Sequence, residues 1–267
     1  MQHDFYDQIS YLIIDTSQND MAQHALSYSQ RLFPLANRIV FSDTLEGWDA
    51  TKVIRIPKLS CVEEYNELLL TNAWKHIRTD FFQIIQWDGH VITPNAFRPN
   101  FLEFDYIGAV WPHHKTRRVG NGGFSLRSKR LMETVEGLLP GVSDWQQIPE
   151  DDLICRTLAE RLEQDHGIRF ADIAMANAYS VEWDFDEFGP APFGFHGLAM
   201  LIAHHQQDLD GLLARLGPVS GWQLVVMSQI ISTLNQQDIA AFYAYLQRHN
   251  LFDEFANHLN IKVERVS

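Results

Sequence analysis

Short apolar runs alternate with stretches of helical spacing along the first part of the chain. Strands are expected at residues 11–14, 38–43, 51–57 and 82–86, and helices at 21–33 and 60–74. Such alternation predicts a mostly parallel α/β sheet with covered faces, and ligands of such sheets lie at the carboxyl ends of the strands. Asp15, Thr16, Asp43 and Asp88 all stand directly after an apolar run.

The pattern beyond this region is helical. Helices are expected at residues 131–138, 151–165, 198–205, 209–216, 222–234 and 239–247. Asn235 is a candidate N-cap for the last of these, and Ser60 is a candidate N-cap for the helix at 60–74, with Glu63 at the capping-box position. We therefore expect a domain over residues 1–200, followed by a helical extension over 201–267.

Charge and cysteine content restrict the class of protein. The chain has 267 residues, of which 21 are Lys or Arg and 34 are Asp or Glu, for a formal net charge of −13. A surface that binds nucleic acid would have to be positively charged against this negative overall field. We therefore do not expect nucleic acid as a partner. Two cysteines, Cys61 and Cys155, fit a reducing compartment. No signal peptide and no run of about 18 apolar residues occurs, so we expect a cytoplasmic protein without a transmembrane segment.

The segment Gly120–Arg127 joins three glycines and an asparagine to a β-strand-like run, and it has neither P-loop nor dinucleotide-fingerprint spacing. Four further motifs accompany it in order: Gln86–Gly89, Phe101–Trp111, Pro149–Asp151 and Phe193–Gly197. Together, over about residues 9–200, they resemble a bacterial family of largely uncharacterised glycosyltransferase domains. The resemblance implies a GT-A-like, Rossmann-like sheet with helices on its faces, and a role in bacterial glycan biosynthesis.

The resemblance also implies a divalent cation, Mn²⁺ or alternatively Mg²⁺, held through Asp88. This aspartate follows an apolar strand and precedes a glycine, at the place where GT-A enzymes bind metal. Gln86 stands where a first acidic residue often occurs. His196 is the candidate second ligand. The alternatives are a turn-forming aspartate at Asp88 and a packed core histidine at His196.

An acidic run, Glu150-Asp151-Asp152, supplies the candidate catalytic groups. By resemblance to inverting GT-A enzymes, Asp151 is expected to deprotonate the acceptor hydroxyl, and Glu150 to orient the acceptor or assist. The alternative is helix capping, since acidic residues favour helix N-termini. The residues expected to bind the nucleotide-sugar are Thr16, Asp43, Gln86, Trp87, Asp88, Asn121, Gly122 and Gly123.

Glycine positions are expected to leave room for a sugar and to expose amides to its oxygens, while Trp87, Trp111 and Trp183 offer stacking faces. Arg127 is expected to pair with Asp105 or with a diphosphate.

The basic segment Pro112–Arg118 is either a solvated loop or a flap over an anionic ligand.

These patterns favour a glycosyltransferase that moves a sugar from a nucleotide-sugar, UDP-linked, to a glycan-type acceptor. Two alternatives remain open: a nucleotidyltransferase acting on sugar phosphates, and a catalytically degenerate domain that binds glycan or a protein partner. The helices after residue 200 are a candidate surface for a protein partner or for self-association.

Overall fold

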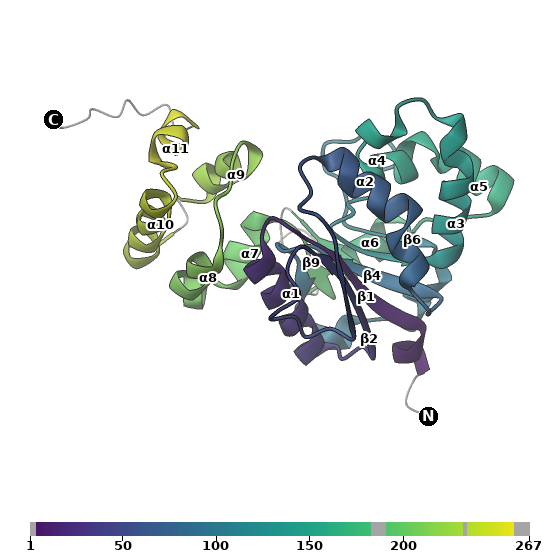
Figure 1. The fold of residues 1–267 in the computed structure, drawn as a ribbon, viewed down its shortest axis with the longest axis horizontal. Helices are drawn as coiled ribbons and strands as arrows, with labels where there is room; N and C mark the ends of the chain where they lie inside the picture. The colour runs from purple at the N-terminus through teal and green to yellow at the C-terminus, as the bar shows by residue number, and fades with distance from the viewer. Residues whose placement is uncertain (1–3, 183–190, 232–233, 259–267) are drawn as a thin grey trace. The chain divides into compact units, whose positions relative to one another are not determined.

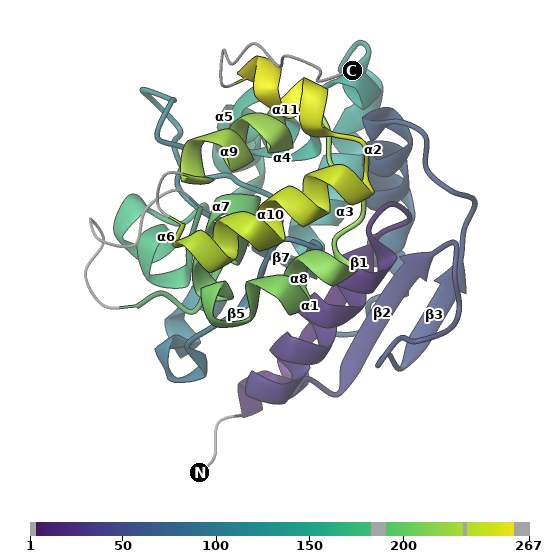
Figure 2. The same cartoon turned by 90° about the vertical axis from the view of Figure 1, so that its left-hand side faces the viewer.

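The computed structural model describes residues 4–182, 191–231 and 234–258. The chain separates into two compact units, Met1–His196 and Gly197–Ser267. In the first unit a central sheet has the strand order β3-β2-β1-β4-β7-β6. Its strands are β1 (Ile9–Ile14), β2 (Asn37–Ser42), β3 (Lys52–Arg55), β4 (Phe81–Ile85), β6 (Tyr106–Ile107) and β7 (Phe124–Ser128). Figure 2 shows β1, β2 and β3 as neighbouring strands.

The first four strands of the sheet are parallel, so their carboxyl ends meet at one edge. Strand β7 runs antiparallel to β4, with Ile85 opposite Phe124, and β6 pairs antiparallel with β7. The amino end of β7, which follows the glycine segment, therefore lies at the same edge as the carboxyl end of β4. This reversal brings the Gln86–Gly89 motif beside Gly122 and Gly123.

Helices cover both faces of this sheet (Figure 1). They are α1 (Asn19–Leu32), α2 (Val62–Thr71), α3 (Lys129–Leu138), α4 (Glu150–Asp152), α5 (Ala159–His166) and α6 (Ile173–Tyr179). A π-helical turn, Leu153–Thr157, separates α4 from α5. On one face, alternate residues of the strands, such as Leu12, Phe41 and Phe82, pack with apolar residues of α2, α3 and α5. On the other, Tyr11 donates to the Phe33 carbonyl beyond the end of α1 (2.7 Å).

A second, smaller sheet has the order β5-β9-β8, formed by β5 (His90–Val91), β9 (Gly194–Phe195) and β8 (Ser180–Val181). Strand β5 follows the Asp88-Gly89 turn, and β9 immediately precedes His196. Because β9 pairs with both β5 and β8, residues far apart in sequence converge beside the main sheet.

The second unit contains α7 (Leu198–His204), α8 (Leu209–Arg215), α9 (Trp222–Ile230), α10 (Gln236–Arg248) and α11 (Phe252–His258). Asn235 caps α10 as predicted, since its side chain accepts from the Asp238 amide (3.0 Å). Phe242 of α10 packs edge-on against Phe255 of α11, with ring centroids 5.4 Å apart. No helix in the described ranges is both long and apolar enough to cross a membrane.

Several sequence-based boundaries need correction. The N-cap residue of α2 is Cys61 rather than Ser60, and the Ser60 amide donates instead to Glu64 (2.7 Å). This helix ends at Thr71 rather than at residue 74. The last part of the apolar pattern belongs to a separate 3₁₀ turn, Ala73–His76. The single helix expected at 151–165 is interrupted by the π-helical turn, and α6 and α11 were not predicted.

Candidate functional site

Acidic side chains gather at the carboxyl edge of the parallel strands. Asp15 follows β1, and its Oδ1 accepts from the amides of Ser17 (2.8 Å) and Gln18 (2.7 Å), which shapes the turn into α1. Burial, together with a smaller effect of the Asp88 and Asp43 charges, raises the pKa of Asp15 to about 6, although the two amide hydrogen bonds lower it. This edge of the sheet therefore disfavours additional negative charge unless a cation accompanies it.

Thr16 and Asp43, two of the predicted nucleotide-binding residues, lie at this edge and hold neighbouring segments of the chain. Thr16 Oγ1 accepts from the Leu59 amide (3.0 Å), and Asp43 Oδ1 accepts from the Asn19 side chain (2.8 Å). Both contacts fix the loops that follow the strands. In this structure, Thr16 and Asp43 thus hold the chain at the carboxyl edge of the sheet.

Asp88 and His196, the two predicted metal ligands, are brought together by the second sheet. Asp88 Oδ1 lies 3.2 Å from His196 Nε2, and both side chains are mostly buried. Gly89 makes this approach feasible, because a Cβ at this position would lie only 2.7 Å from the carbonyl oxygen of Phe195. The Asp-Gly sequence therefore serves the packing of β9 as well as the turn after β4.

Gln86 lies against the same histidine. Its Oε1 is 3.2 Å from His196 Nε2, and its Nε2 donates to the Tyr65 hydroxyl (3.3 Å). Two oxygens, one from Gln86 and one from Asp88, therefore converge on a single imidazole nitrogen. This arrangement suits a positive charge at that nitrogen.

Glu182 is a functional candidate that the motifs did not reveal. It follows β8 directly, and its Oε1 lies 3.6 Å from His196 Nδ1, on the other side of the ring from Asp88. Burial lowers the pKa of His196, but the charges of Asp88 and Glu182 outweigh it and raise the pKa to about 10. The only signal in the sequence was a carboxylate directly after Tyr179-Ser180-Val181.

The donor atoms of this cluster fit a divalent cation. Asp88 Oδ1 is buried and has no hydrogen-bond partner among the described residues, although it lies 3.2 Å from His196 Nε2. A carboxylate oxygen and an imidazole nitrogen are ligands that Mn²⁺ accepts, and a carboxylate beside the other ring nitrogen is the usual support of a metal-bound histidine. Asp88 and His196 are thus the residues that would hold a cation, with Glu182 behind His196.

Asp151, the predicted base, lies against the glycine segment. Its Oδ2 accepts from the Gly122 amide (3.0 Å), and its Oδ1 accepts from the Asp152 amide (2.9 Å). Burial raises the pKa of Asp151 to about 7, with a further contribution from the charge of Glu150. A carboxyl group with this pKa is suited to accept a proton near neutral pH.

Glu150 is engaged in a buried ion pair. Arg127, which is fully buried, donates to both oxygens of Glu150, with Nη2 2.8 Å from Oε1. The Arg127 guanidinium also lies over the Tyr106 ring, 4.9 Å from its centroid. The expected pairing of Arg127 with Asp105 is wrong, because Asp105 pairs with Arg130.

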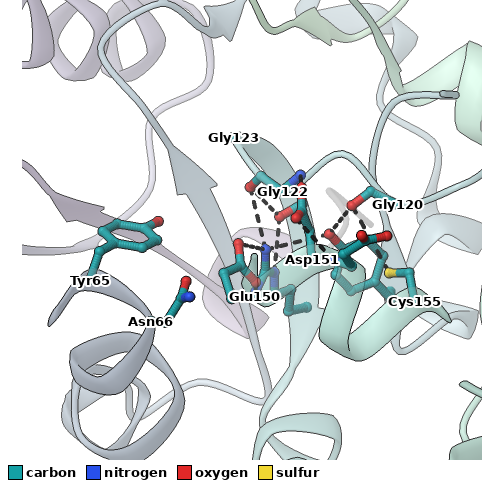
Figure 3. A network of polar contacts seen from close by, with 12 residues as sticks. Tyr65, Asn66, Gly120, Gly122, Gly123, Glu150, Asp151 and Cys155 are labelled. Atoms are coloured by element: carbon teal, nitrogen blue, oxygen red, sulfur yellow. Dashed lines mark hydrogen bonds and ion pairs between the residues drawn. The ribbon is translucent and has the colours of Figure 1, made fainter. Parts of the chain in front are cut away.

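The glycine pair separates these two groups of side chains. A Cβ at Gly123 would overlap the imidazole of His196, whereas a Cβ at Gly122 would overlap Glu150 and lie 3.1 Å from Asp151 Cβ. In Figure 3 the carboxylates of Glu150 and Asp151 both face this segment. The two glycines are thus required for the close approach of the protein's own side chains.

This packing corrects the expectation that the glycines leave room for a sugar and expose their amides. The Gly122 amide donates to Asp151, and the Gly123 amide donates to the side chain of Asn121 (3.1 Å). Asn121 itself is buried.

Two of the predicted stacking residues, Trp87 and Trp111, do not offer open faces. Trp87 and Trp111 are 9% and 6% exposed, so both rings belong to the packed interior, contrary to expectation. The Trp111 ring lies against Gly120, where a side chain would overlap it. Trp183 lies outside the described residues.

Sequence comparison assigns residues 50–196 to a family described as "Protein of unknown function (DUF5672)". The chain belongs to this family. A search of curated proteins finds no match.

Among solved structures, a glycosyltransferase involved in the glycosylation of the major capsid of PBCV-1 is similar to this DUF5672 chain, with a TM-score of 0.50 and 11% identity over 74% of this chain and 98% of that one. The bifunctional IspDF of Campylobacter jejuni aligns with a TM-score of 0.39 and 11% identity over 57% of this chain and 47% of that one.

The first of these similarities shows the fold of this DUF5672 protein. At 11% identity it shows no more than the fold, which is α/β and glycosyltransferase-like and has a mostly parallel sheet. The predicted fold class is therefore confirmed. The site adds an independent observation: a candidate cation cluster and a carboxylate suited to proton transfer lie on either side of two consecutive glycines.

Proposed function

We propose that this protein is a glycosyltransferase that moves a sugar from a nucleotide-sugar, UDP-linked, to a glycan-type acceptor with inversion at the anomeric carbon. The observation that carries the proposal is the pair Gly122-Gly123, against which Asp151 lies on one side and His196 on the other. This arrangement supports the proposal, because the residues assigned to donor binding and to proton removal contact adjacent residues of the backbone.

Asp88 and His196 are assigned to the donor side. A divalent cation bound there would neutralise the charge that develops on the departing diphosphate. Glu182 lies 3.6 Å from His196 Nδ1 and orients the ring, so that Nε2 is directed to the same side as the Asp88 carboxylate. Gln86 contacts the same nitrogen and stands where a second carboxylate would add negative charge.

Asp151 is assigned the role of base. Its carboxylate takes the proton of the acceptor hydroxyl while the hydroxyl oxygen bonds to the anomeric carbon. The bond between that carbon and the diphosphate oxygen breaks, and the nucleoside diphosphate leaves with the electron pair. Two backbone amides hold the Asp151 carboxylate, and its pKa of about 7 allows it to be ionised and still basic at neutral pH.

Glu150 and Arg127 act as positioning residues in this scheme. Both oxygens of Glu150 are bonded to Arg127, so Glu150 is not free to accept a proton from substrate. The pair fixes the start of α4, on which Asp151 stands.

The test is a titration of the protein with uridine diphosphate in the presence of Mn²⁺, in EDTA, and in the Asp88→Asn variant. At about a hundred times its dissociation constant, the nucleotide should add about 2.7 kcal/mol of apparent stability with Mn²⁺. EDTA and Asp88→Asn should each abolish this effect while leaving the fold intact. Stabilisation that survives EDTA would assign Asp88 to structure.

Product analysis separates the remaining alternatives. Release of a nucleoside diphosphate from a nucleotide-sugar supports glycosyl transfer. Release of inorganic diphosphate from a nucleoside triphosphate and a sugar phosphate would favour nucleotidyl transfer. Binding of glycan without nucleotide binding would favour a degenerate binding domain.

A further inference from the structure

The hairpin formed by β6 and β7 extends beyond the sheet and ends in the basic segment Pro112–Arg118. Val110 and Val119 pair antiparallel at the base of this tip. Beneath the tip is a cavity of about 590 Å³, between the segment Lys115–Val119 and the start of α6. This volume is within the range of small-molecule sites, roughly 300–1,000 Å³.

One wall of the cavity is cationic. Lys115, Arg117 and Arg118 line it, and Arg117 is neutralised by Glu163 (2.8 Å). Within the described part of the chain, neither Lys115 nor Arg118 forms an ion pair. The acidic residue on the facing side, Asp172, caps α6 by accepting from the Met175 amide (2.8 Å). Lys115 and Arg118 therefore line the cavity without a carboxylate partner, and Arg118 Nε donates to the Trp111 carbonyl (3.4 Å).

The opposite wall is apolar apart from Asp172. It consists of Phe170, Ala171, Ile173 and Ala174, and Cys155 also lines the cavity. Ile173 is 42% exposed, an unusual environment for a large aliphatic side chain at the start of a helix. A cavity with a cationic side and an apolar side suits an anion that carries an apolar group.

The cavity lies next to the candidate base. Cys155 follows Asp151 by about one helical turn, and Figure 3 shows the two side chains on the same stretch of chain beside Gly120 and Gly122. Val119 lines the cavity and Gly122 contacts Asp151, so three residues of backbone connect the two places. At about 3.3 Å per residue of fully extended chain, these three residues span at most about 10 Å.

We propose that this cavity binds the anionic end of the acceptor, a phosphate ester that carries an apolar group. The orientation of the acceptor rests on the proposed function: its hydroxyl lies at Asp151 and its phosphate lies between Lys115 and Arg118. Binding at the cavity itself requires neither donor nor cation, so it is measured separately from transfer.

The experiment uses octyl phosphate as probe and calorimetric titration of the full chain without nucleotide. Inorganic phosphate and octyl glucoside test the anionic and the apolar parts alone. The variant Lys115→Gln/Arg118→Gln removes the two unpaired charges, and Ala174→Trp fills the cavity from an exposed position. The matched control, Lys75→Gln/Arg161→Gln, removes the same charge from exposed positions outside the cavity.

Octyl phosphate should bind saturably, and at least about tenfold more tightly than either partial probe. The loss of two charge-assisted contacts in Lys115→Gln/Arg118→Gln should weaken it by at least about tenfold. Ala174→Trp should also abolish binding, whereas the control variant and Asp88→Asn should bind normally. Equal affinity of the cavity variants and the control, or equal binding of octyl glucoside, would overturn the proposal.

Vesicles that contain phosphatidate distinguish two sources of this chemistry. Vesicles that displace octyl phosphate from the native chain, but do not bind Lys115→Gln/Arg118→Gln, would identify a bilayer lipid as the source. Displacement by a soluble phosphate ester alone would identify a free acceptor. In both cases the cavity assignment stands. If Lys115→Gln/Arg118→Gln and the native chain bind the vesicles equally, the lipid binds at another surface. That result would contradict the assignment of phosphate binding to the cavity.

Discussion

Protonation of Asp151 near neutral pH can be tested without knowing the substrate. Burial and the charge of Glu150 raise its pKa from 3.8 to about 7 in the folded chain. Because one pKa unit corresponds to about 1.4 kcal/mol, ionising Asp151 in the native structure costs about 4 kcal/mol more than in the unfolded chain. Replacing it with asparagine, Asp151→Asn, removes this cost while leaving an oxygen for the amide of Gly122.

The direction of the pH dependence follows from the sign of the shift. The folded pKa lies above the unfolded value, so the native chain retains a proton that the unfolded chain releases. The favourable contribution of native Asp151 is fully present below about pH 4 and is lost as the pH rises through 7. The stability of Asp151→Asn relative to the native chain should therefore increase between these limits, by up to about 4 kcal/mol.

Two measurements check this result. Urea unfolding of both proteins at several pH values between 4 and 8 gives the difference in stability as a function of pH. Carbon NMR of aspartate carboxyl groups gives the pKa directly, and the signal lost in Asp151→Asn but retained in Asp152→Asn belongs to Asp151. A midpoint below about pH 5, or a stability difference that does not change with pH, would refute the reasoning and remove the basis for Asp151 as a base at neutral pH.

Three further substitutions test other parts of the site. Gly123→Ala should displace the adjacent imidazole and lower Mn²⁺-dependent affinity for uridine diphosphate at least about tenfold by calorimetry, whereas Gly137→Ala, an open helical position, should gain about 1 kcal/mol in urea unfolding. Arg127→Met should cost about 3–5 kcal/mol by leaving Glu150 unpaired, and Arg127→Met/Glu150→Met should recover most of it; an additive double variant would contradict a coupled pair. Glu182→Gln should weaken Mn²⁺ binding, measured by electron paramagnetic resonance without nucleotide, about 10–100-fold; unchanged affinity would remove its positioning role.

The main sheet was predictable because its inner parallel strands, β1 and β4, are largely buried on both faces and read as apolar runs. Strand β1, for example, is buried at every position from Ile9 to Ile14. The place of Asp88 followed from the same pattern, since a polar residue directly after such a run must lie at an edge of the sheet. The antiparallel direction of β7 did not follow, because a single strand's periodicity is the same in both directions.

The second sheet explains most of what sequence reasoning missed at the site. Its strands are only two residues long, too short for any periodic signal, yet they bring Asp88, Glu182 and His196 together. The role of Gly89 in this packing is visible only when Phe195 is in place. Similarly, π-helical geometry after Asp152 interrupts what the apolar pattern presents as one continuous helix.

The buried Arg127–Glu150 pair affects the pKa of the neighbouring Asp151. The charge of Glu150 raises the pKa of Asp151 and that of Arg127 lowers it, so the ion pair has opposing effects on its neighbour. Burial, the largest influence, then keeps the pKa of Asp151 near neutrality. If Glu150 lacked Arg127, its unpaired charge would raise the pKa of Asp151 further and keep that carboxyl protonated. The buried pair thus holds the Glu150 carboxylate on Arg127 and leaves Asp151 as the neighbouring carboxyl group whose pKa lies near neutrality.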